Sequence, residues 1–223
     1  AVKVDNSQQP NSRWYSGSGI YRNVWLVRTN EVYVDHWGTF VTTPKIDSNS
    51  AFIVTQLKIK NESDDNKLVN IENIILDSKG EKVISNEIKN VLINKKSIHE
   101  IFEKFIISNP SLWSTDNPKL YTLITNIYQK NKKIDQYKTT FGIRYFWFDK
   151  DSGFYLNGKS LKILGVCNHH DLGCLGAAIN VRALERQLEI LKEMGCNAIR
   201  TSHNPPAPEL LDLCDKMGFL VMD

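Results

Sequence analysis

The chain has 223 residues, a net charge of +3 and an apolar content of 41%. This composition is enough to build cores, so we expect a folded, soluble chain of one large or two ordinary domains. The lysine clusters lie in predicted turns and form no basic stripe, so we expect no nucleic-acid partner. No apolar run approaches the roughly 18 residues of a membrane-spanning helix, so we expect no membrane span.

The first 28 residues hold two strand-like runs, Val2–Asp5 and Ile20–Arg28, joined by a polar loop. Two strands do not form a stable domain alone. They either belong to a larger domain or form an arm that is disordered or docked on an edge. The chain opens directly on a strand-like run, without a signal peptide or initiator Met. Any export signal would lie upstream, so periplasmic, secreted and cytoplasmic locations stay open.

From about Glu31 to Tyr145, short apolar runs alternate with turn signals, as in an immunoglobulin-like β-sandwich. Between Ile53 and Lys60, apolar and polar residues alternate, as expected for a strand with one solvated face. Turns are expected at 61–66, 77–80 and 130–133. The predicted strands are Val32–Trp37, Thr39–Thr43, Phe52–Lys60, Val69–Leu76, Val83–Ile93, Ile98–Ile107, Tyr121–Tyr128 and Gln136–Arg144.

The segment Ile98–Ile107 is ambiguous, because its apolar residues also recur at helical spacing and Ser97 with Glu100 can form a capping box. The surrounding strands favour a strand here. Trp113, next to Pro110 and Pro118, is expected to fill the core.

The last third alternates strands with helices. A small hairpin is predicted around Asn157-Gly158. Asn180 and Gly195 are expected to cap the first helix, and Gly218 to end the second. Strands separated by helices of this length form right-handed parallel crossovers. The predicted elements are strand Leu161–Val166, helix Val181–Met194, strand Ala198–Thr201, a helix from about Ala207 to Met217, and strand Phe219–Met222.

Polar side chains follow each of these three strands. The carboxyl ends of parallel strands carry the ligand site in α/β folds, so we expect imidazole, guanidinium and carboxylate groups on one rim. The residues concerned are His169, His170 and Asp171, then Arg200, Ser202, His203 and Asn204, and finally Asp223.

The four cysteines, Cys167, Cys174, Cys196 and Cys214, all lie in this region and are expected to be buried thiols. Two of them flank the adjacent histidines, which raises the alternative of a zinc site. A structural zinc site needs four converging groups, whereas a continuing strand would send neighbouring histidines to opposite faces. We therefore expect no metal and no other cofactor.

The segments GVCNHHDLG and NAIRTSHNP, with LLDLCDKMGFLVM after them, resemble the start of the barrel domain of glycoside hydrolase family 2. RWYSGSGIYRNVWL, LWSTDNPKLYTL and FGIRYFWFD resemble further family segments in the family's order. The resemblance implies a multidomain fold. Residues 1–28 would be the last strands of a jelly-roll sugar-binding domain, 29–145 an immunoglobulin-like sandwich, and 146–223 the first βα units of a (β/α)8 TIM barrel.

The family contains β-galactosidases, β-glucuronidases and β-mannosidases, and HHDLG most resembles the β-galactosidase branch. The resemblance implies a retaining exo-β-glycosidase, which uses two carboxyl groups about 5–5.5 Å apart. In the family these are glutamates on later barrel strands. We therefore expect them beyond Asp223, and predict that this chain alone is inactive.

The resemblance also implies that the substrate-binding residues are His169, Asp171, Arg200, His203, Asn204 and Arg13. His169 would bind sugar hydroxyls, and Arg200 would hold the nucleophile ionised. Asn204 replaces a Tyr found in many members, and Arg13 replaces an acidic residue. The alternatives are structural histidines, a structural salt bridge for Arg200, and His203 as a cap of the following helix.

Two other classes remain open: a non-catalytic carbohydrate-binding sandwich, and a scaffold without sugar affinity. The binding module would expose a row of aromatic residues, for which Trp37, Tyr121 and Tyr128 are candidates. A barrel cut after three strands would also expose an open edge, which predicts self-association through that edge.

Overall fold

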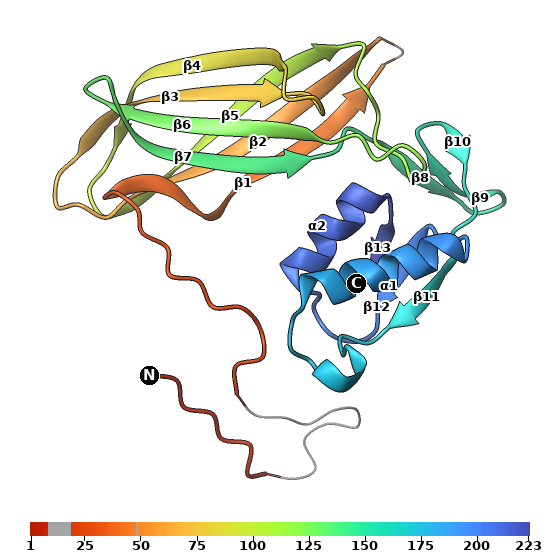
Figure 1. Cartoon of the computed structure of the whole chain (residues 1–223). Helices are drawn as coiled ribbons and strands as arrows, with labels where there is room; N and C mark the ends of the chain where they lie inside the picture. Colours follow the sequence, from red (N-terminus) through yellow and green to blue (C-terminus); the bar gives the residue numbers. More distant parts are fainter. Residues whose placement is uncertain (9–18, 48) are drawn as a thin grey trace.

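The computed structural model describes residues 1–8, 19–47 and 49–223. A β-sandwich is followed by a three-stranded antiparallel sheet and then by a small parallel α/β unit (Figure 1). The sandwich strands are β1 (Val32–Ile46), β2 (Ser50–Asn61), β3 (Lys67–Leu76), β4 (Lys82–Ile93), β5 (Ser97–Ser108), β6 (Tyr121–Gln129) and β7 (Lys132–Phe141).

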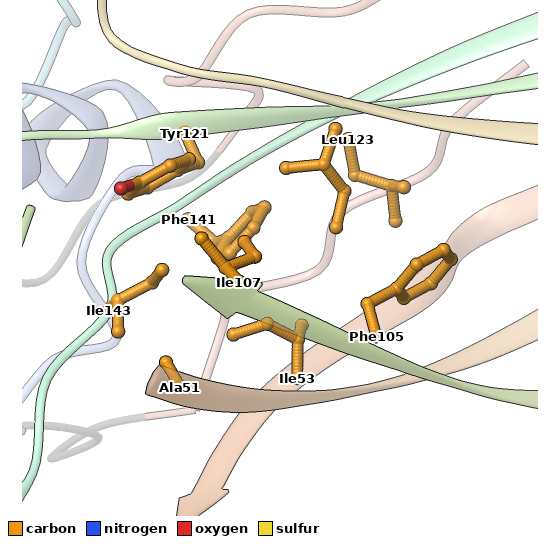
Figure 2. Close-up of a cluster of buried hydrophobic side chains, with 9 residues drawn as sticks. Ala51, Ile53, Phe105, Ile107, Tyr121, Leu123, Phe141 and Ile143 are labelled. Carbon is orange, nitrogen blue, oxygen red and sulfur yellow. The ribbon is translucent and has the colours of Figure 1, made fainter. Parts of the chain in front are cut away.

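The sandwich consists of two antiparallel sheets, with strand orders β1-β2-β5 and β4-β3-β6-β7. Alternate residues of β2 are buried, as the sequence pattern predicts. Figure 2 shows one of the core clusters, in which Ile53 and Phe105 of the first sheet pack with Leu123 and Phe141 of the second. The predicted sandwich is confirmed, and Ile98–Ile107 lies in strand β5, paired with β2 along its whole length.

The predicted boundaries of the first and the last sandwich strand are wrong. Val32–Trp37 and Thr39–Thr43 belong to one strand, β1, because pairing with β2 resumes after a register shift between Val34 and Thr39. A Cβ at Gly38 would lie 2.7 Å from the carbonyl oxygen of Asp35, so the bulge requires glycine. The last strand runs from Lys132 to Phe141 and not from Gln136 to Arg144. It starts early because the turn needs only Lys130 and Asn131, both with positive φ.

The three-stranded sheet joins the sandwich to the α/β unit. It comprises β8 (Phe146–Asp149), β9 (Gly153–Leu156) and β10 (Lys159–Ser160), so the predicted hairpin is confirmed and gains a third strand. Trp113 is only 2% exposed and packs against this sheet. Its indole Nε1 donates a 2.7 Å hydrogen bond to the carbonyl of Asp215, which ties the sandwich to the unit behind it.

The α/β unit has three parallel strands in the order β11-β12-β13. One face of this sheet packs against the helices, as Ile199 does in its contact with Leu188. The side chain of Asn180 caps α1 at the nitrogen of Ala183. The elements are β11 (Gly165–Asn168), the 3-10 helix η1 (Gly173–Leu175), α1 (Val181–Glu193), β12 (Ala198–Thr201), α2 (Pro208–Met217) and β13 (Leu220–Met222).

The first strand of this unit begins later than predicted. Its partner β12 starts at Ala198, opposite Gly165, so residues 161–164 have no strand beside them. The amide of Leu164 instead donates to the Asn197 side chain at 2.8 Å. The strand-like residues Leu161–Val166 therefore pair only at their end.

The predicted strands Val2–Asp5 and Ile20–Arg28 are absent, because no neighbouring strand pairs with residues 1–8 or 19–30. An extended arm leads instead into β1 (Figure 1). Its large apolar side chains are solvent-exposed, among them Trp25 at 77% and Leu26 at 101%. The assignment of residues 1–28 to a jelly-roll domain stays a prediction. No helix within the described ranges is long and apolar enough to cross a membrane.

Candidate active site

The three parallel strands bring the polar residues of the sequence motif to one end of the sheet. Register pairs Cys167 with Arg200, and Arg200 with Met222. Side chains of neighbouring residues in register point to the same face of a sheet. Arg200 therefore lies on the middle strand, β12, and its side chain is on the sheet face opposite the helices.

His169, Arg200 and His203 lie together at the carboxyl ends of β11 and β12. The rings of His169 and His203 are 5.9 Å apart and nearly perpendicular. Nη2 of Arg200 lies 3.4 Å from Nδ1 of His203, which can accept a hydrogen bond in the tautomer that leaves this nitrogen unprotonated. The structure thus brings together the three residues that the sequence placed on one rim. Their role in sugar binding stays a prediction.

Arg200 lines a hollow of 490 Å³ on the inner face of the parallel sheet. Apolar side chains form most of its wall, including Phe146 and Phe148 of β8 and Leu220 of β13. In the part of the chain that the structure describes, no carboxylate forms a salt bridge with Arg200. The alternative of a structural salt bridge therefore has no partner among the described residues, and the role of Arg200 stays a prediction.

The loop after β12 has an unusual backbone at His203, whose φ is +66°. This left-handed conformation is uncommon for a residue with a side chain. The residues before and after His203 are held by hydrogen bonds. The amide of Ser202 donates to the carbonyl of Asn168 at 2.7 Å. The side chain of Asn204 donates to the carbonyl of Ser202 at 3.2 Å. The N-cap of α2 is Ala207, so His203 does not cap this helix.

The remaining predicted site residues are less closely associated. Asp171 lies in the loop that precedes η1, and Arg13 lies outside the described residues. Asp223 accepts a 2.6 Å hydrogen bond from the hydroxyl of Thr201, which holds this carboxylate at the end of β13.

The four cysteines are free thiols, but the prediction that all are buried is wrong. Cys214 is buried, Cys196 is partly buried, and Cys167 and Cys174 are exposed. Cys167 is exposed because it lines the inner hollow. This hollow lies on the face of the sheet that the helices do not cover. The described residues contain no group of three or more His, Cys, Asp or Glu side chains that could hold a metal ion.

Sequence reasoning missed Tyr21 and Arg22 of the arm. The guanidinium of Arg22 donates to the carbonyls of Pro205 and Pro206, in the loop that carries His203. The ring of Tyr21 lies 5.9 Å from that of His170. Both residues belong to the GIYR part of the RWYSGSGIYRNVWL segment, which was the only signal available.

Comparison with protein families gives two matches. Residues 32–144 match the model for glycosyl hydrolases family 2, and residues 149–223 match the model for the TIM barrel domain of that family. The predicted order of a sandwich followed by the start of a TIM barrel is therefore confirmed.

Among curated proteins, a β-galactosidase from Bacteroides ovatus named BoGH2A is 52% identical over 100% of this chain and 26% of its own length. A putative β-glucuronidase from Formosa agariphila is 37% identical over 100% of this chain and 21% of its own length. The chain thus spans about a quarter of the length of these relatives.

Among solved structures, a glycosyl hydrolase family 2 member from Bacteroides cellulosilyticus superposes with a TM-score of 0.91 at 42% identity. The match covers 99% of this chain and 30% of the other. A β-glucuronidase from Bacteroides uniformis gives a TM-score of 0.90 at 30% identity, over 98% of this chain and 27% of the other.

Proposed function

Because the chain belongs to glycosyl hydrolases family 2, we propose that it supplies part of the substrate-binding rim of a retaining exo-β-glycosidase. One observation carries the proposal. His169, Arg200 and His203 meet at the carboxyl ends of two parallel strands, above a hollow on the sheet face that the helices leave free. Active sites of (β/α)8 enzymes lie at this end of the strands.

In this proposal the two imidazoles hydrogen-bond to hydroxyl groups of the terminal sugar, while Arg200 stands next to the nucleophilic carboxylate. A permanently charged guanidinium stabilises an adjacent carboxylate and lowers its pKa, which keeps the nucleophile ionised. Arg200 is suited to this role, since no carboxylate of the described residues forms a salt bridge with it. Asp171 and Asn204 would complete the polar rim, and a substrate-binding role for Arg13 stays a prediction.

The acid/base and the nucleophile are proposed to lie outside these 223 residues. A retaining enzyme needs two carboxyl groups about 5–5.5 Å apart across the scissile bond. Of the carboxylates at this rim, Asp223 is held by the hydroxyl of Thr201, and Asp171 lies in the loop before η1. We assign neither of them to the catalytic pair, so the chain alone is proposed to be inactive.

We propose a terminal β-D-galactoside as the substrate. The supporting observation is the 52% identity with the β-galactosidase from Bacteroides ovatus, against 37% with the putative β-glucuronidase from Formosa agariphila. The alternatives within the family are a β-glucuronide and a β-mannoside. A glucuronide carries a carboxylate, so a site that binds it needs a cation beyond the one assigned to the nucleophile.

The test measures release of p-nitrophenol from the aryl β-D-galactoside, β-D-glucuronide and β-D-mannoside by the full-length gene product that contains these residues. We expect the galactoside to be hydrolysed with the highest kcat/KM and with retention of configuration. Preference for another of the three sugars would overturn the substrate, and inactivity on all three would overturn the function. The 223-residue chain assayed alone should release nothing.

Arg200→Met tests the role of the rim directly. Loss of a charge that stabilises the reacting groups is expected to lower kcat/KM by about 100- to 1,000-fold. Arg182→Met is the matched control, because Arg182 is an exposed arginine of α1 that pairs with Glu185 and Glu189. Equal activities of the two variants would contradict the proposed role of Arg200.

A further inference from the structure

The N-terminal arm contacts both loops that form the rim. Tyr21 approaches His170 in the loop after β11, with 5.9 Å between the ring centroids. Arg22, stacked at 5.2 Å on the Tyr21 ring, reaches the loop after β12. The hydrogen bonds of Arg22 join segments that are 183 and 184 residues apart in the chain.

The loop after β12 is poor in hydrogen-bond donors where the arm meets it. Pro205, Pro206 and Pro208 have no backbone N–H, so this stretch cannot be held by a regular hydrogen-bond ladder. The carbonyls of Pro205 and Pro206 accept hydrogen bonds from the two terminal nitrogens of the Arg22 guanidinium, the second at 3.2 Å. The planar fork of arginine suits two neighbouring acceptors.

A second contact fixes the start of α2. The side-chain amide of Asn23 donates to Oε1 of Glu209, in the first turn of that helix, at 2.7 Å. Arg22 and Asn23 therefore hold both sides of the turn that leads from the loop into the helix.

The contacts of Arg22 and Asn23 with the loop and the start of α2 form a clamp. The loop that this clamp holds contains a residue with a strained backbone, His203. His203 adopts a φ of +66°, and such a conformation persists only where surrounding contacts hold it. The Ser202 amide bonded to Asn168 holds the loop from the strand side, and the arm holds it from the helix side. Behind the loop, a cavity of 30 Å³ lined by Arg22, His169 and Asn204 leaves room for a shift.

We infer that Arg22, assisted by Asn23, is a positioning residue that keeps His203 and Asn204 in the geometry needed at the rim. The inference rests on the proposed glycosidase function, in which the arm would position the loop that carries His203. Arg22 acts through the loop after β12, to whose carbonyls it is bonded.

The test compares Arg22→Met, Arg22→Lys and the control Arg28→Met in the full-length protein. Arg28 is an exposed arginine of the same arm, outside the clamp. Hydrogen bonds to a charged group are individually strong, so Arg22→Met should lower kcat by about 10- to 100-fold. Arg22→Lys should recover part of this loss, because an ammonium group can donate to one of the two carbonyls. Arg28→Met should match the unmodified protein.

Hydrogen–deuterium exchange provides a readout that does not need the substrate. Amides of Ser202, His203 and Asn204 should exchange about 10- to 100-fold faster in Arg22→Met than in Arg28→Met. If the unmodified protein hydrolyses no aryl glycoside, the proposed function fails and exchange alone decides whether the clamp exists. Unchanged exchange and a kcat within twofold of the unmodified protein would overturn the inference.

Asn23→Ala keeps the inference testable if Arg22→Met does not fold, because it removes only the contact with Glu209. A smaller fall in kcat, of about threefold to tenfold, is expected from the loss of this one hydrogen bond. The melting temperature of each variant is measured alongside. Loss of activity with faster exchange confined to the loop supports positioning, whereas uniformly faster exchange across the barrel strands would mean general destabilisation and count against it.

Discussion

Cys214 shows how burial sets the chemistry of a single residue. Its side chain lies in the core between the helices and the parallel sheet, with 1% of its surface exposed. Burial, with a smaller contribution from the negative charge of Asp215, raises the pKa of the Cys214 thiol to about 12. A buried thiol with this pKa is protonated at neutral pH, and only the thiolate is nucleophilic.

We predict that iodoacetamide at pH 8 alkylates Cys167 and Cys174, which are exposed, and leaves Cys214 unmodified. This pH lies far below the pKa of about 12, so Cys214 stays in the unreactive thiol form. Peptide mass spectrometry after a timed reaction measures the modification at each position. In urea, all cysteines should react. Modification of Cys214 at the rate of Cys167 in the folded protein would contradict the assigned burial.

At the scale of the element, α2 ends where it meets the sandwich. Gly218 adopts a φ of +77° as the C-cap, and a Cβ at this position would lie 2.2 Å from the carbonyl oxygen of Thr115. Lys192 of α1 donates to the same carbonyl at 2.8 Å and to that of Gly218 at 3.2 Å. The end of the helix is therefore fixed by the loop that also carries Trp113.

Gly218→Ala is predicted to destabilise the protein more than Gly195→Ala does. Both glycines have a positive φ, so both substitutions cost about 1–2 kcal/mol of unfolding free energy. At Gly195 nothing lies within 4 Å of the added Cβ, whereas at Gly218 it collides with the backbone of Thr115. The collision should add about 1–3 kcal/mol. Urea unfolding of the two variants measures the difference, and equal midpoints would disprove the close contact.

At the scale of the whole molecule, the inner face of the parallel sheet remains open. Phe148 is 70% exposed and Met222 is 59% exposed, and both line the hollow that contains Arg200. β13 is also an edge strand. An open edge beside an exposed apolar patch favours association with another chain.

We predict that the 223-residue chain, produced by itself, self-associates through this face. Light scattering after size exclusion should give a mass that rises with protein concentration. Met222→Lys should lower the association, because it places a charge in the hollow. Met194→Lys is the control, since Met194 is 67% exposed but lies at the end of α1, away from the hollow. A constant monomer mass would refute the prediction.

Local patterns predicted the type and order of most elements. Alternation in β2 and the three-to-four spacing in α1 identify which side of each element is apolar, and this side must be buried. In β5 the apolar residues fit both the spacing of a helix and that of a strand, so only pairing with β2 decides between the two. Predicted strand boundaries were wrong where the length of the neighbouring strand sets them. β11 begins at Gly165, for example, because its partner β12 begins opposite it at Ala198.

The sequence by itself determined the parallel direction of the last three strands, and with it the rim where His169, Arg200 and His203 meet. The physical reason is that helices of this length rule out hairpins between the strands and are typical of right-handed parallel crossovers. Only the tertiary structure decided that Arg22 holds the loop of His203 and that Cys167 is exposed. Contacts between residues far apart in the chain depend on how complete elements pack, and no local period of the sequence encodes that packing.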